Sequence, residues 1–409
     1  MLDMTQREAL ELIESSDIKF VRLAFCDVCG TQKNVSIQAA ELERAFEHGV
    51  AFDASSIAGF RDPSQSDLFL FPDPTTMVLL PWRPSRGGVA RFFCDIRNPD
   101  GTPFSADCRK FLADTEKLLL EHDLRCDIGA ECEFYLFKCD ENGNPTDIPL
   151  DRAGYFDIAP ADCGENVRRE ICMTLESMGI QPERSHHEQG PGQNEIDFRY
   201  SSALNAADHV ITFKQVVRTV AARNGLWASF APKPLADNAG NGFHINCSIT
   251  HADLSAADEK QFLSFMAGIL QRTPEMTAVL NPLAESYDRL GKDKAPNRVS
   301  WSPSNRSQLI RIPATVSPTQ RMELRSPDAS ANPYLAFGLV LRAGLDGILR
   351  GLTPPPPCNQ NLLDAPESVR QQYPALPTDL DAARRLMTES TFLHKHMPAH
   401  LFTACAGDL

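Results

Sequence analysis

Acidic and histidine side chains in four short segments of this chain could bind divalent cations. Residues 127–137 alternate polar and apolar side chains as a β-strand does, so Glu131 and Glu133 project to one side and Phe134 and Leu136 to the other. Two carboxylates on one strand face repel each other unless a cation lies between them. The pattern therefore predicts a metal site, whose candidate ligands over the four segments are Glu131, Glu133, Glu188, Glu195, His244 and Glu323.

Two of the other segments have the spacing of a hairpin and a strand. The Gly-Pro-Gly sequence at 190–192 predicts a tight turn that brings Glu188 and Glu195 together. The strand predicted at 242–249 carries on one face His244, Asn246 and Ser248. Taken alone, each of these two patterns is more typical of a packed histidine or a salt-bridged sheet face than of a functional site.

Arginines accompany the candidate metal ligands. In the fourth segment, 321–325, two arginines flank Glu323. Guanidinium groups hold phosphoryl oxygens bidentately and neutralise charge on a transferred phosphoryl group, so arginines beside a carboxylate cluster indicate phosphate chemistry. The chain has neither GxxxxGK[ST] nor GxGxxG after a strand, which excludes the two commonest nucleotide-binding loops. The arginines in question are Arg289, Arg306, Arg311, Arg321 and Arg325.

The composition fits an intracellular enzyme. The chain has 409 residues, of which 42 % are hydrophobic and 23 % charged. Its net charge of −14 argues against nucleic acid as a partner; bound Mg²⁺ or Mn²⁺ would suit it, although an acidic surface is the commoner reason. No stretch approaches the roughly 20 apolar residues of a membrane span, and residues 1–12 lack a signal-peptide pattern. We therefore expect a cytoplasmic protein with no membrane partner.

The elements that must position these residues fall into two regions. Residues 1–105 carry β patterns and one helical period, at 39–48, which predicts a small α+β domain. From residue 106 to 409, helical periods alternate with the strands that carry the polar residues, which predicts helices packed on a sheet. The fold class is therefore α+β. The strands expected in the first region are 19–28, 32–37 and 89–96, and the helices expected in the second are 107–122, 165–178, 204–224, 258–270 and 333–349.

Several motifs resemble those of the glutamine synthetase family, in the family's order and over nearly the whole chain. The resemblance implies a β-grasp-like N-terminal domain over 1–105 and a catalytic domain of antiparallel strands with packed helices over 106–409. It also implies active sites between neighbouring subunits of a homo-oligomeric ring, commonly a dodecamer. The motifs are Asn305-Arg306-Ser307 with Arg311-Ile312-Pro313, His187-Glu188 with Gly192-Gln193-Asn194-Glu195, and the run from Glu323 to Ala329 with Asn332-Pro333-Tyr334.

The resemblance also implies a reaction and a set of metal ligands. In this family ATP phosphorylates the γ-carboxylate of glutamate, which turns a carboxylate oxygen into a leaving group, and an amine nitrogen then displaces the phosphate. Two or more Mg²⁺ or Mn²⁺ ions assist. Carried over by motif, one ion is held by Glu133, Glu188 and Glu195, and a second by Glu131, His244 and Glu323.

The same resemblance implies substrate and nucleotide contacts. Arg289 matches the residue that anchors the α-carboxylate of glutamate, and Gly240 lies in the glutamate-binding loop. Asn246 stands where many members have a second histidine, and its amide can still hydrogen-bond a substrate or phosphate group. The phosphate and transition-state positions are matched by Arg306, Arg311 and Arg325, with Glu323 beside them, and the nucleotide pocket by Tyr200, Ser248, Arg306, Arg311 and Arg321.

The acceptor amine is the open question. Asp53 lies in a segment that resembles the family loop whose aspartate binds ammonium in the neighbouring subunit's site and helps to remove its proton. The family's second acid, a glutamate before an Ala-Pro pair in a mobile flap, is replaced by Lys294, and the flap is one residue shorter. Three interpretations stay open: Asp293 takes over, Lys294 faces solvent, or the acceptor is a different amine whose carboxylate pairs with Lys294.

The expected function is therefore an ATP-dependent ligase that condenses activated glutamate with ammonia to give glutamine. The first alternative is a γ-glutamyl ligase for another primary amine or an amino acid. A non-catalytic family member is the second alternative, although such a chain would have no reason to keep the metal ligands and arginines. Metal-dependent phosphotransfer from an aminoacyl or guanidino substrate is a third. The sequence also leaves open whether the acid is glutamate itself.

Overall fold

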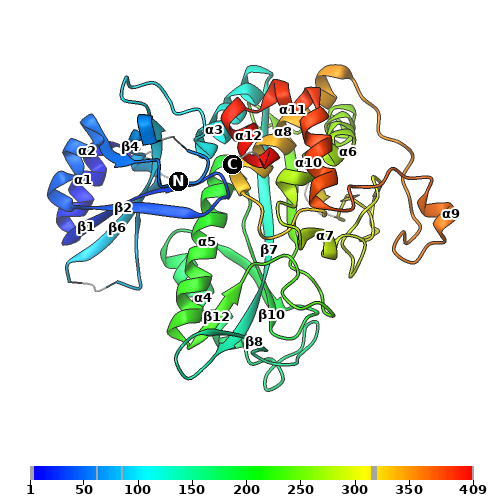
Figure 1. The fold of residues 1–409 in the computed structure, drawn as a ribbon, viewed down its shortest axis with the longest axis horizontal. Helices are drawn as coiled ribbons and strands as arrows, with labels where there is room; N and C mark the ends of the chain where they lie inside the picture. Colours follow the sequence, from blue (N-terminus) through cyan, green and yellow to red (C-terminus); the bar gives the residue numbers. More distant parts are fainter. Residues whose placement is uncertain (1–3, 61–62, 84–85, 315–319, 408–409) are drawn as a thin grey trace.

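The computed structural model describes residues 4–60, 63–83, 86–314 and 320–407, and its N-terminal part forms a small domain at the left of Figure 1. Its sheet has the strand order β2-β1-β6-β4-β3, with β5 paired to β6. Strand β1 is antiparallel to β2 but parallel to β6. Two helices, α1 (Gln6–Ser15) and α2 (Leu42–His48), accompany the sheet, whose strands are β1 (Ile18–Cys26), β2 (Gln32–Gln38), β3 (Val50–Asp53), β4 (Asp67–Pro72), β5 (Val78–Leu79) and β6 (Gly88–Arg97).

The turn between β1 and β2 fixes this domain against the rest of the chain. The Asp27 carboxylate accepts hydrogen bonds from the backbone N–H groups of Cys29 (3.0 Å) and Thr31 (2.8 Å). Gly30 has a φ of +76°, and a Cβ atom there would lie 2.9 Å from the Cα atom of Asn332. Only glycine combines that backbone conformation with so close an approach.

The second domain is built on a larger sheet centred on the long strand β7 (Leu124–Cys139), which runs through the middle of Figure 1. The strand order is β14-β15-β16-β13-β7-β10-β9, and the short strands β8, β11 and β12 also pair with β7. All of these pairs are antiparallel except β14 with β15. The bounds are β8 (Pro145–Pro149), β9 (Pro182–His187), β10 (Gln193–Phe198), β11 (Ser201–Ser202), β12 (Leu226–Ser229), β13 (Phe243–His251), β14 (Trp301–Ser302), β15 (Ile310–Arg311) and β16 (Met322–Leu324).

Helices cover this sheet, and all five that the sequence predicted are confirmed. Aspartate and asparagine side chains cap several of them; the Asp107 carboxylate, for example, accepts from the N–H groups of the first turn of α3. The long helices are α3 (Cys108–Glu121), α4 (Glu165–Ser177), α5 (Ala203–Arg223), α6 (Glu259–Leu280) and α8 (Pro333–Arg350), and the short ones are α7 (Ser286–Arg289), α9 (Glu367–Arg370), α10 (Leu380–Glu389), α11 (Thr391–His396) and α12 (Ala399–Ala406).

Helix α6 is longer than expected. The sequence prediction ended at Leu270, before Pro274, but the helix continues to Leu280. The last five residues of the helix are all buried, with Met276, Ala278 and Val279 in the core. Burial of this apolar surface outweighs the hydrogen bond that Pro274 cannot donate.

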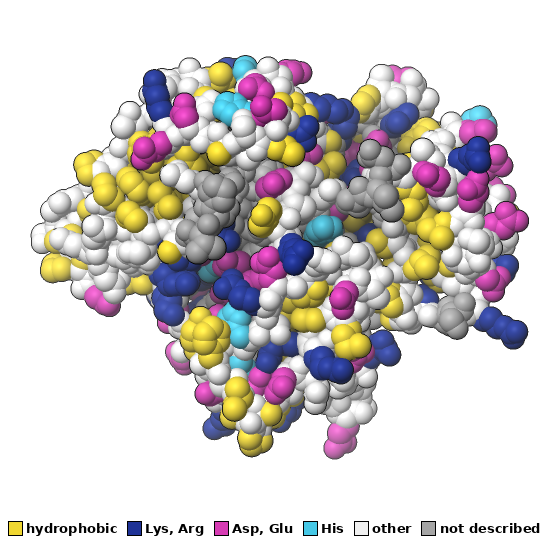
Figure 2. Space-filling model, turned by 180° about the vertical axis from the view of Figure 1, so that it is seen from behind, with side chains coloured by type: hydrophobic (Ala, Val, Ile, Leu, Met, Phe, Trp, Pro, Cys, Tyr) yellow, Lys and Arg dark blue, Asp and Glu magenta, His cyan; other side chains and the backbone are white. Residues whose placement is uncertain are grey.

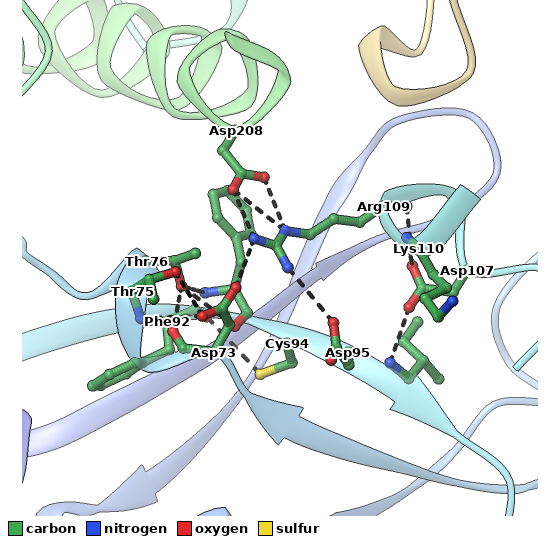
Figure 3. Close-up of polar contacts among 12 residues, drawn as sticks. Asp73, Thr75, Thr76, Phe92, Cys94, Asp95, Asp107, Arg109, Lys110 and Asp208 are labelled. Carbon is green, nitrogen blue, oxygen red and sulfur yellow. Dashed lines mark hydrogen bonds and ion pairs between the residues drawn. The ribbon is translucent and has the colours of Figure 1, made fainter. Parts of the chain in front are cut away.

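A buried ionic cluster joins the two domains (Figure 3). The guanidinium group of Arg109, in α3, donates to both carboxylate oxygens of Asp208, in α5, at 3.0–3.3 Å, and to Asp73 at 2.9 Å. A third carboxylate, Asp95 of β6, lies 3.6 Å away, and the Tyr334 hydroxyl donates to Asp208 at 2.6 Å. The N-terminal sheet is thus attached to the helices that carry the larger sheet.

The predicted fold class is confirmed: a small β-grasp-type domain is followed by a larger α+β domain whose sheet is mainly antiparallel. The first turn of the helix predicted at 39–48 is a 3-10 turn, at residues 39–41, ahead of α2. In the part of the chain that is described, no helix is both long and apolar enough to cross a membrane.

Candidate active site

The strand register of the larger sheet places the candidate metal ligands on one face. In antiparallel pairs, residues directly opposite each other project to the same side with neighbouring Cβ atoms. Glu131 of β7 is opposite His244 of β13, and Glu133 of β7 is opposite Glu195 of β10. Glu323 of β16 is opposite Asn246 of β13, which lies two residues from His244 on the same face of the strand. Segments more than a hundred residues apart therefore meet at one place.

One of the two predicted ligand sets is assembled as a compact group. The Nδ1 atom of His244 lies 3.0 Å from a carboxylate oxygen of Glu131 and 3.7 Å from one of Glu323. One ligand atom from each of these three residues lies within 4.8 Å of the others, a spacing suited to one metal ion. Asn246 donates to the other oxygen of Glu131 at 3.1 Å and so orients that carboxylate.

The second predicted set is assembled in a slightly different form. The predicted hairpin is confirmed and brings Glu188 and Glu195 together, with His186 as the third member of a group spanning no more than 4.8 Å. The Nε2 atom of His186 lies 2.9 Å from Glu188 and 3.8 Å from Glu195. Glu133, the predicted third ligand, lies outside this group because its carboxylate accepts from the backbone N–H of Gly242 (2.7 Å) and the Gln193 amide (3.1 Å).

The electrostatics of this face show an excess of negative charge. Burial raises the pKa of Glu195 well above its usual value, and the charges of Asp197 and Glu133 raise it further. Burial and the charge of Glu188 likewise raise the pKa of Glu133. Burial opposes ionisation of Glu131 too, but the hydrogen bond and charge of His244 lower its pKa to about 2. Buried carboxylates require cationic partners to stay ionised, and the face around Glu195 has too few of them among the described residues.

Arginines surround Glu323 at the other end of the face. Its side chain is fully buried, and the Nε atom of Arg311 donates to one carboxylate oxygen at 2.5 Å. Arg325 donates to the other oxygen, and its Nε atom donates to the backbone carbonyl of Arg306 at 3.0 Å. Burial would raise the pKa of Glu323, but the charges of Arg325 and His244 lower it. These contacts fix the two guanidinium groups beside the metal-ligand group.

Two glycines let Arg289 approach the same face. The buried guanidinium group of Arg289 donates to the backbone carbonyls of Ser326 (2.8 Å) and Arg325 (3.4 Å). A Cβ atom at Gly240 would lie 2.9 Å from Arg289 Cγ, and one at Gly242 would lie 2.9 Å from its Nη2 atom. A larger residue at either position would displace this arginine.

A cavity of about 700 Å³ opens on this face. Figure 2, which views the molecule from behind, shows acidic and basic side chains gathered with a histidine around a hollow in this part of the surface. The sequence-predicted residues that line the cavity are Glu131, Glu133, Glu188, Glu195, Gly240, His244, Arg289, Lys294, Arg306, Arg311, Arg321 and Arg325.

A second cavity of about 310 Å³ lies behind the first and shares Glu131, Arg184 and Arg321 with it. Asn246, which the sequence assigned to the substrate, lines this second cavity. The other sequence-predicted residues of its wall are the nucleotide candidates Tyr200 and Ser248.

Two predicted site residues line neither cavity: Glu323, which is fully buried beside Arg311 and Arg325, and Asp53. Asp53 ends β3 in the N-terminal domain, and its exposed carboxylate accepts from the backbone N–H (2.9 Å) and hydroxyl (2.6 Å) of Ser55. These hydrogen bonds lower its pKa. A single chain does not bring Asp53 to the metal-ligand face.

The flap segment at 291–296 contributes residues 292–295 to the wall of the larger cavity. The Lys294 ammonium group lies 5.3 Å from the centroid of the Tyr155 ring, within cation–π range. Asp293 is paired with the buried Lys233 at 3.1 Å, and both Asp293 and Lys294 have positive φ angles. Lys294 is exposed and also lines the cavity, which agrees both with a lysine that faces solvent and with one that pairs with an acceptor.

Sequence reasoning missed several residues of this site. Among them are His186 in the second ligand group, Tyr155 beside the flap lysine, Gln193, whose amide contacts Glu133, and Arg184, which lines both cavities. The signal for His186 was present, because it lies two residues before Glu188 on the same face of a strand. Tyr155 is in an irregular loop, where no periodicity could place it.

Comparisons with known proteins agree over the full length of the chain. The family model described as glutamine synthetase, catalytic domain, matches residues 105–406, and the glutamine synthetase beta-grasp domain matches residues 17–99. A glutamine synthetase of Clostridium saccharobutylicum is 43 % identical over 98 % of this chain and 93 % of its own. One from Methanosarcina mazei is 44 % identical over 99 % of this chain and 94 % of its own.

Solved structures give the same result. A complex of GmaS with ADP has a TM-score of 0.89 at 29 % identity and covers 97 % of this chain and 94 % of its own. The Plasmodium falciparum glutamine synthetase, at 23 % identity, shares the fold with a TM-score of 0.86 over 98 % of this chain and 94 % of its own. On the family models and the full-length relatives, the chain is a member of the glutamine synthetase family.

Proposed function

We propose that this protein is an ATP-dependent ligase that activates glutamate as γ-glutamyl phosphate and condenses it with ammonia to give glutamine. The observation that carries the proposal is the cavity of about 700 Å³ whose wall holds carboxylates of both candidate ligand groups and six arginines. Relatives named glutamine synthetase, which are 41–44 % identical to this chain over nearly its whole length, support ammonia rather than a different amine as the acceptor.

The acidic groups fit divalent metal ions. Carboxylate and imidazole ligands at these separations suit Mg²⁺ or Mn²⁺. Burial first and neighbouring carboxylates second raise the pKa of Glu195, and a bound cation would offset both. Glu131, His244 and Glu323 would hold one ion, and Glu188 and Glu195 with Glu133 a second, to which His186 is also close. Bound ions would neutralise phosphate charge during transfer.

The arginines supply the remaining positive charge. Arg289, held by backbone carbonyls beside Gly240, is placed to pair with the α-carboxylate of glutamate. Arg306 and Arg325, near Glu323, are placed to bind the transferred phosphoryl group and stabilise charge on its oxygens.

The second cavity is our candidate for the nucleotide. Tyr200 and Ser248 line it, Arg321 lies at its boundary with the first cavity, and Arg311 is nearby on the phosphate side. Asn246 would contact the nucleotide side of the site and orient Glu131 rather than touch glutamate.

Asp53 fits the proposal only in an oligomer. We assign its carboxylate to the active site of a neighbouring subunit, where it would bind ammonium and accept a proton before the nitrogen attacks the acyl phosphate. A homo-oligomeric ring, a dodecamer by resemblance, would supply that neighbour. A cytoplasmic location stays a prediction from the sequence.

A complementation experiment tests the assignment of Asp53. Asp53→Ala and Glu323→Ala subunits should each be inactive alone. Co-expression should restore part of the activity, because some sites then combine an intact catalytic face with an intact Asp53. No recovery in mixed oligomers verified by mass would contradict a shared site.

The reaction is tested by release of ADP and phosphate from ATP and glutamate with Mg²⁺ or Mn²⁺, with products identified by mass. Ammonium should give glutamine, and Glu323→Ala should abolish turnover while the matched surface variant Glu389→Ala keeps it. Methylamine, ethanolamine, polyamines and amino acids serve as competing acceptors. A γ-glutamyl amide from one of these, with ammonium inert, would replace the ammonia-ligase proposal by the alternative acceptor.

A further inference from the structure

A third cavity, of about 240 Å³, lies away from the catalytic face, between the N-terminal sheet and α5, which are neighbours in Figure 1. Its wall contains three arginines, Arg22, Arg83 and Arg91, together with the amides Gln32 and Gln215. Among the described residues, no carboxylate lines it. A partly enclosed space with three guanidinium groups and no acid is strongly electropositive.

The register of the sheet forces two of these arginines together. Arg22 of β1 is directly opposite Arg91 of β6 in a parallel pair, so both side chains leave the same face of the sheet. Neighbouring strands are about 4.8 Å apart, and like charges directly opposite each other are destabilising. The arrangement calls for a negative charge between them.

Polar groups in this wall also lack partners. Arg91 is only 3 % exposed, and its Nε atom has no hydrogen-bond acceptor among the residues that the structure describes. The Oε1 atoms of Gln32 and Gln215 are buried without a donor, and rotating either amide by 180° would present its NH₂ group there instead. Buried polar atoms left unpaired cost free energy, so several in one cavity indicate an absent ligand.

The other contacts of Arg91 leave its charge uncompensated. One Nη atom donates to the Thr212 hydroxyl at 3.1 Å, and the guanidinium carbon lies 3.9 Å from the centroid of the Phe93 ring. Burial lowers the pKa of Arg91 to about 10, and the charge of Asp208 opposes this only in part. Nearby Arg109, by contrast, has three carboxylates.

We propose that this cavity is a binding site for a small anion carrying a carboxylate or phosphate group, separate from the catalytic site. Guanidinium groups bind both kinds of oxyanion bidentately. The volume is several times the roughly 30 Å³ that one water occupies in the liquid, which leaves room for an anion of several heavy atoms. An occupant would bridge the N-terminal sheet to α5 and so stabilise the domain junction.

The test is protection of individual arginines from phenylglyoxal, which modifies free guanidinium groups, in the full-length protein. Modification is followed peptide by peptide by mass spectrometry at constant ionic strength set with sodium chloride. Inorganic phosphate forms one arm and malonate the other, which separates the two oxyanion sources. Arg44, an exposed arginine of the same domain paired with Glu41, is the internal control.

Modification of Arg22 and Arg83 should slow by roughly tenfold at an anion concentration about ten times Kd, while that of Arg44 stays constant. The local readout separates this site from the catalytic cavity, where phosphate would also bind. Equal slowing of all three arginines, no slowing, or inaccessibility of Arg22 and Arg83 without anion would each overturn the proposal.

A variant gives an independent measurement. Arg83→Gln changes an exposed side chain and should fold normally. The rise in Tm that the protecting anion causes should be smaller in Arg83→Gln than in the matched Arg44→Gln, with KM for ATP and glutamate unchanged. An equal rise in both variants would overturn the proposal.

Discussion

Two buried charged clusters in this molecule differ in how completely their charges are compensated. At the domain junction, the Arg109 guanidinium group is surrounded by Asp73, Asp95 and Asp208 (Figure 3). On the catalytic face, Glu195 is buried and Glu133 half-buried, and the pKa values of both are raised because burial and neighbouring carboxylates oppose ionisation.

The difference separates structure from function. A cluster whose charges are matched within the chain has reached its lowest free energy without a ligand, whereas an unmatched cluster sacrifices stability until a ligand binds. The arginine-lined cavity beside β1 and β6 is the cationic counterpart of the catalytic face by the same criterion. Variants in each cluster should therefore respond in opposite ways.

The largest effect is expected from Glu195→Gln. Loss of a metal-ligand carboxylate should lower kcat/KM at least about 100-fold, since even groups that only support metal ligands cost 10–100-fold. The metal-free protein should unfold at a higher temperature than the unaltered protein, because the substitution removes a carboxylate whose folded-state pKa is raised. ADP release and calorimetry in a chelator measure the two quantities; a lower Tm would contradict the comparison.

Arg109→Met should show the reverse behaviour. Removing one partner of a buried ionic cluster leaves Asp208 uncompensated and should cost about 3–5 kcal/mol of unfolding free energy. The kcat per folded molecule should be unchanged because the cluster does not line the catalytic cavity. Urea unfolding checks this against Arg44→Met, which breaks an exposed pair with Glu41 worth about 0–1 kcal/mol. Equal costs would mean that the junction cluster contributes no more than a surface pair.

The junction also contains a group with a pH-dependent contribution. Burial raises the pKa of Asp107, which caps α3, to about 6, although backbone N–H groups of Ile96 and Lys110 lower it. The folded state holds this proton at pH values where the unfolded chain has lost it. Stability from this group is therefore complete below pH about 4 and lost as the pH rises to about 6, an effect on the order of 3 kcal/mol.

Asp107→Asn isolates that contribution. Asparagine caps helices about as well as aspartate but does not titrate. The variant should lose the decrease in unfolding free energy between pH 4 and 6 and should be at least as stable as the unaltered protein at pH 7. Urea unfolding across this pH range measures the slope; an unchanged slope would assign it to other groups.

Local sequence signals explain which parts of the molecule were predictable. The helices with capping residues and the strands with alternating polarity were found because their determinants lie within a few residues of one another. The two-residue strands β14 and β15 were missed, since they pair through a sheet that assembles from distant segments. Pro274 gave a local stop signal that long-range packing of α6 overrides.

The same limit applies to the site. The ligands on β7, β13 and β16 could be placed on one face from alternation alone, but their partners across the sheet depend on register, which the sequence does not encode locally. Hence the proximity of His186 to Glu188 and Glu195 was not predicted. The arginine cavity left no signal, because Arg22 and Arg91 are far apart in the chain and single surface arginines are ordinary.

The smallest expected effect is at the flap, where Lys294 adds one positive charge to the rim of the catalytic cavity. If ammonium binds beneath the flap, Lys294→Ala should lower KM for ammonium about fivefold, corresponding to about 1 kcal/mol of repulsion between unit charges 4 Å apart in water. The KM for glutamate should not change. Loss of the contact with Tyr155, worth about 0.5–1 kcal/mol, should also loosen the flap and increase ADP release that yields no amide.

Lys294→Arg separates the two roles, because arginine keeps both the charge and the attraction to the Tyr155 ring. It should retain the KM for ammonium and the tight coupling of ADP release to amide formation. Steady-state kinetics with both products measured give each quantity. If the KM for ammonium is the same in Lys294→Ala and the unaltered protein, the acceptor binds away from Lys294. The charge of Lys294 would then be balanced within the chain, like that of Arg109, and would not act on the substrate.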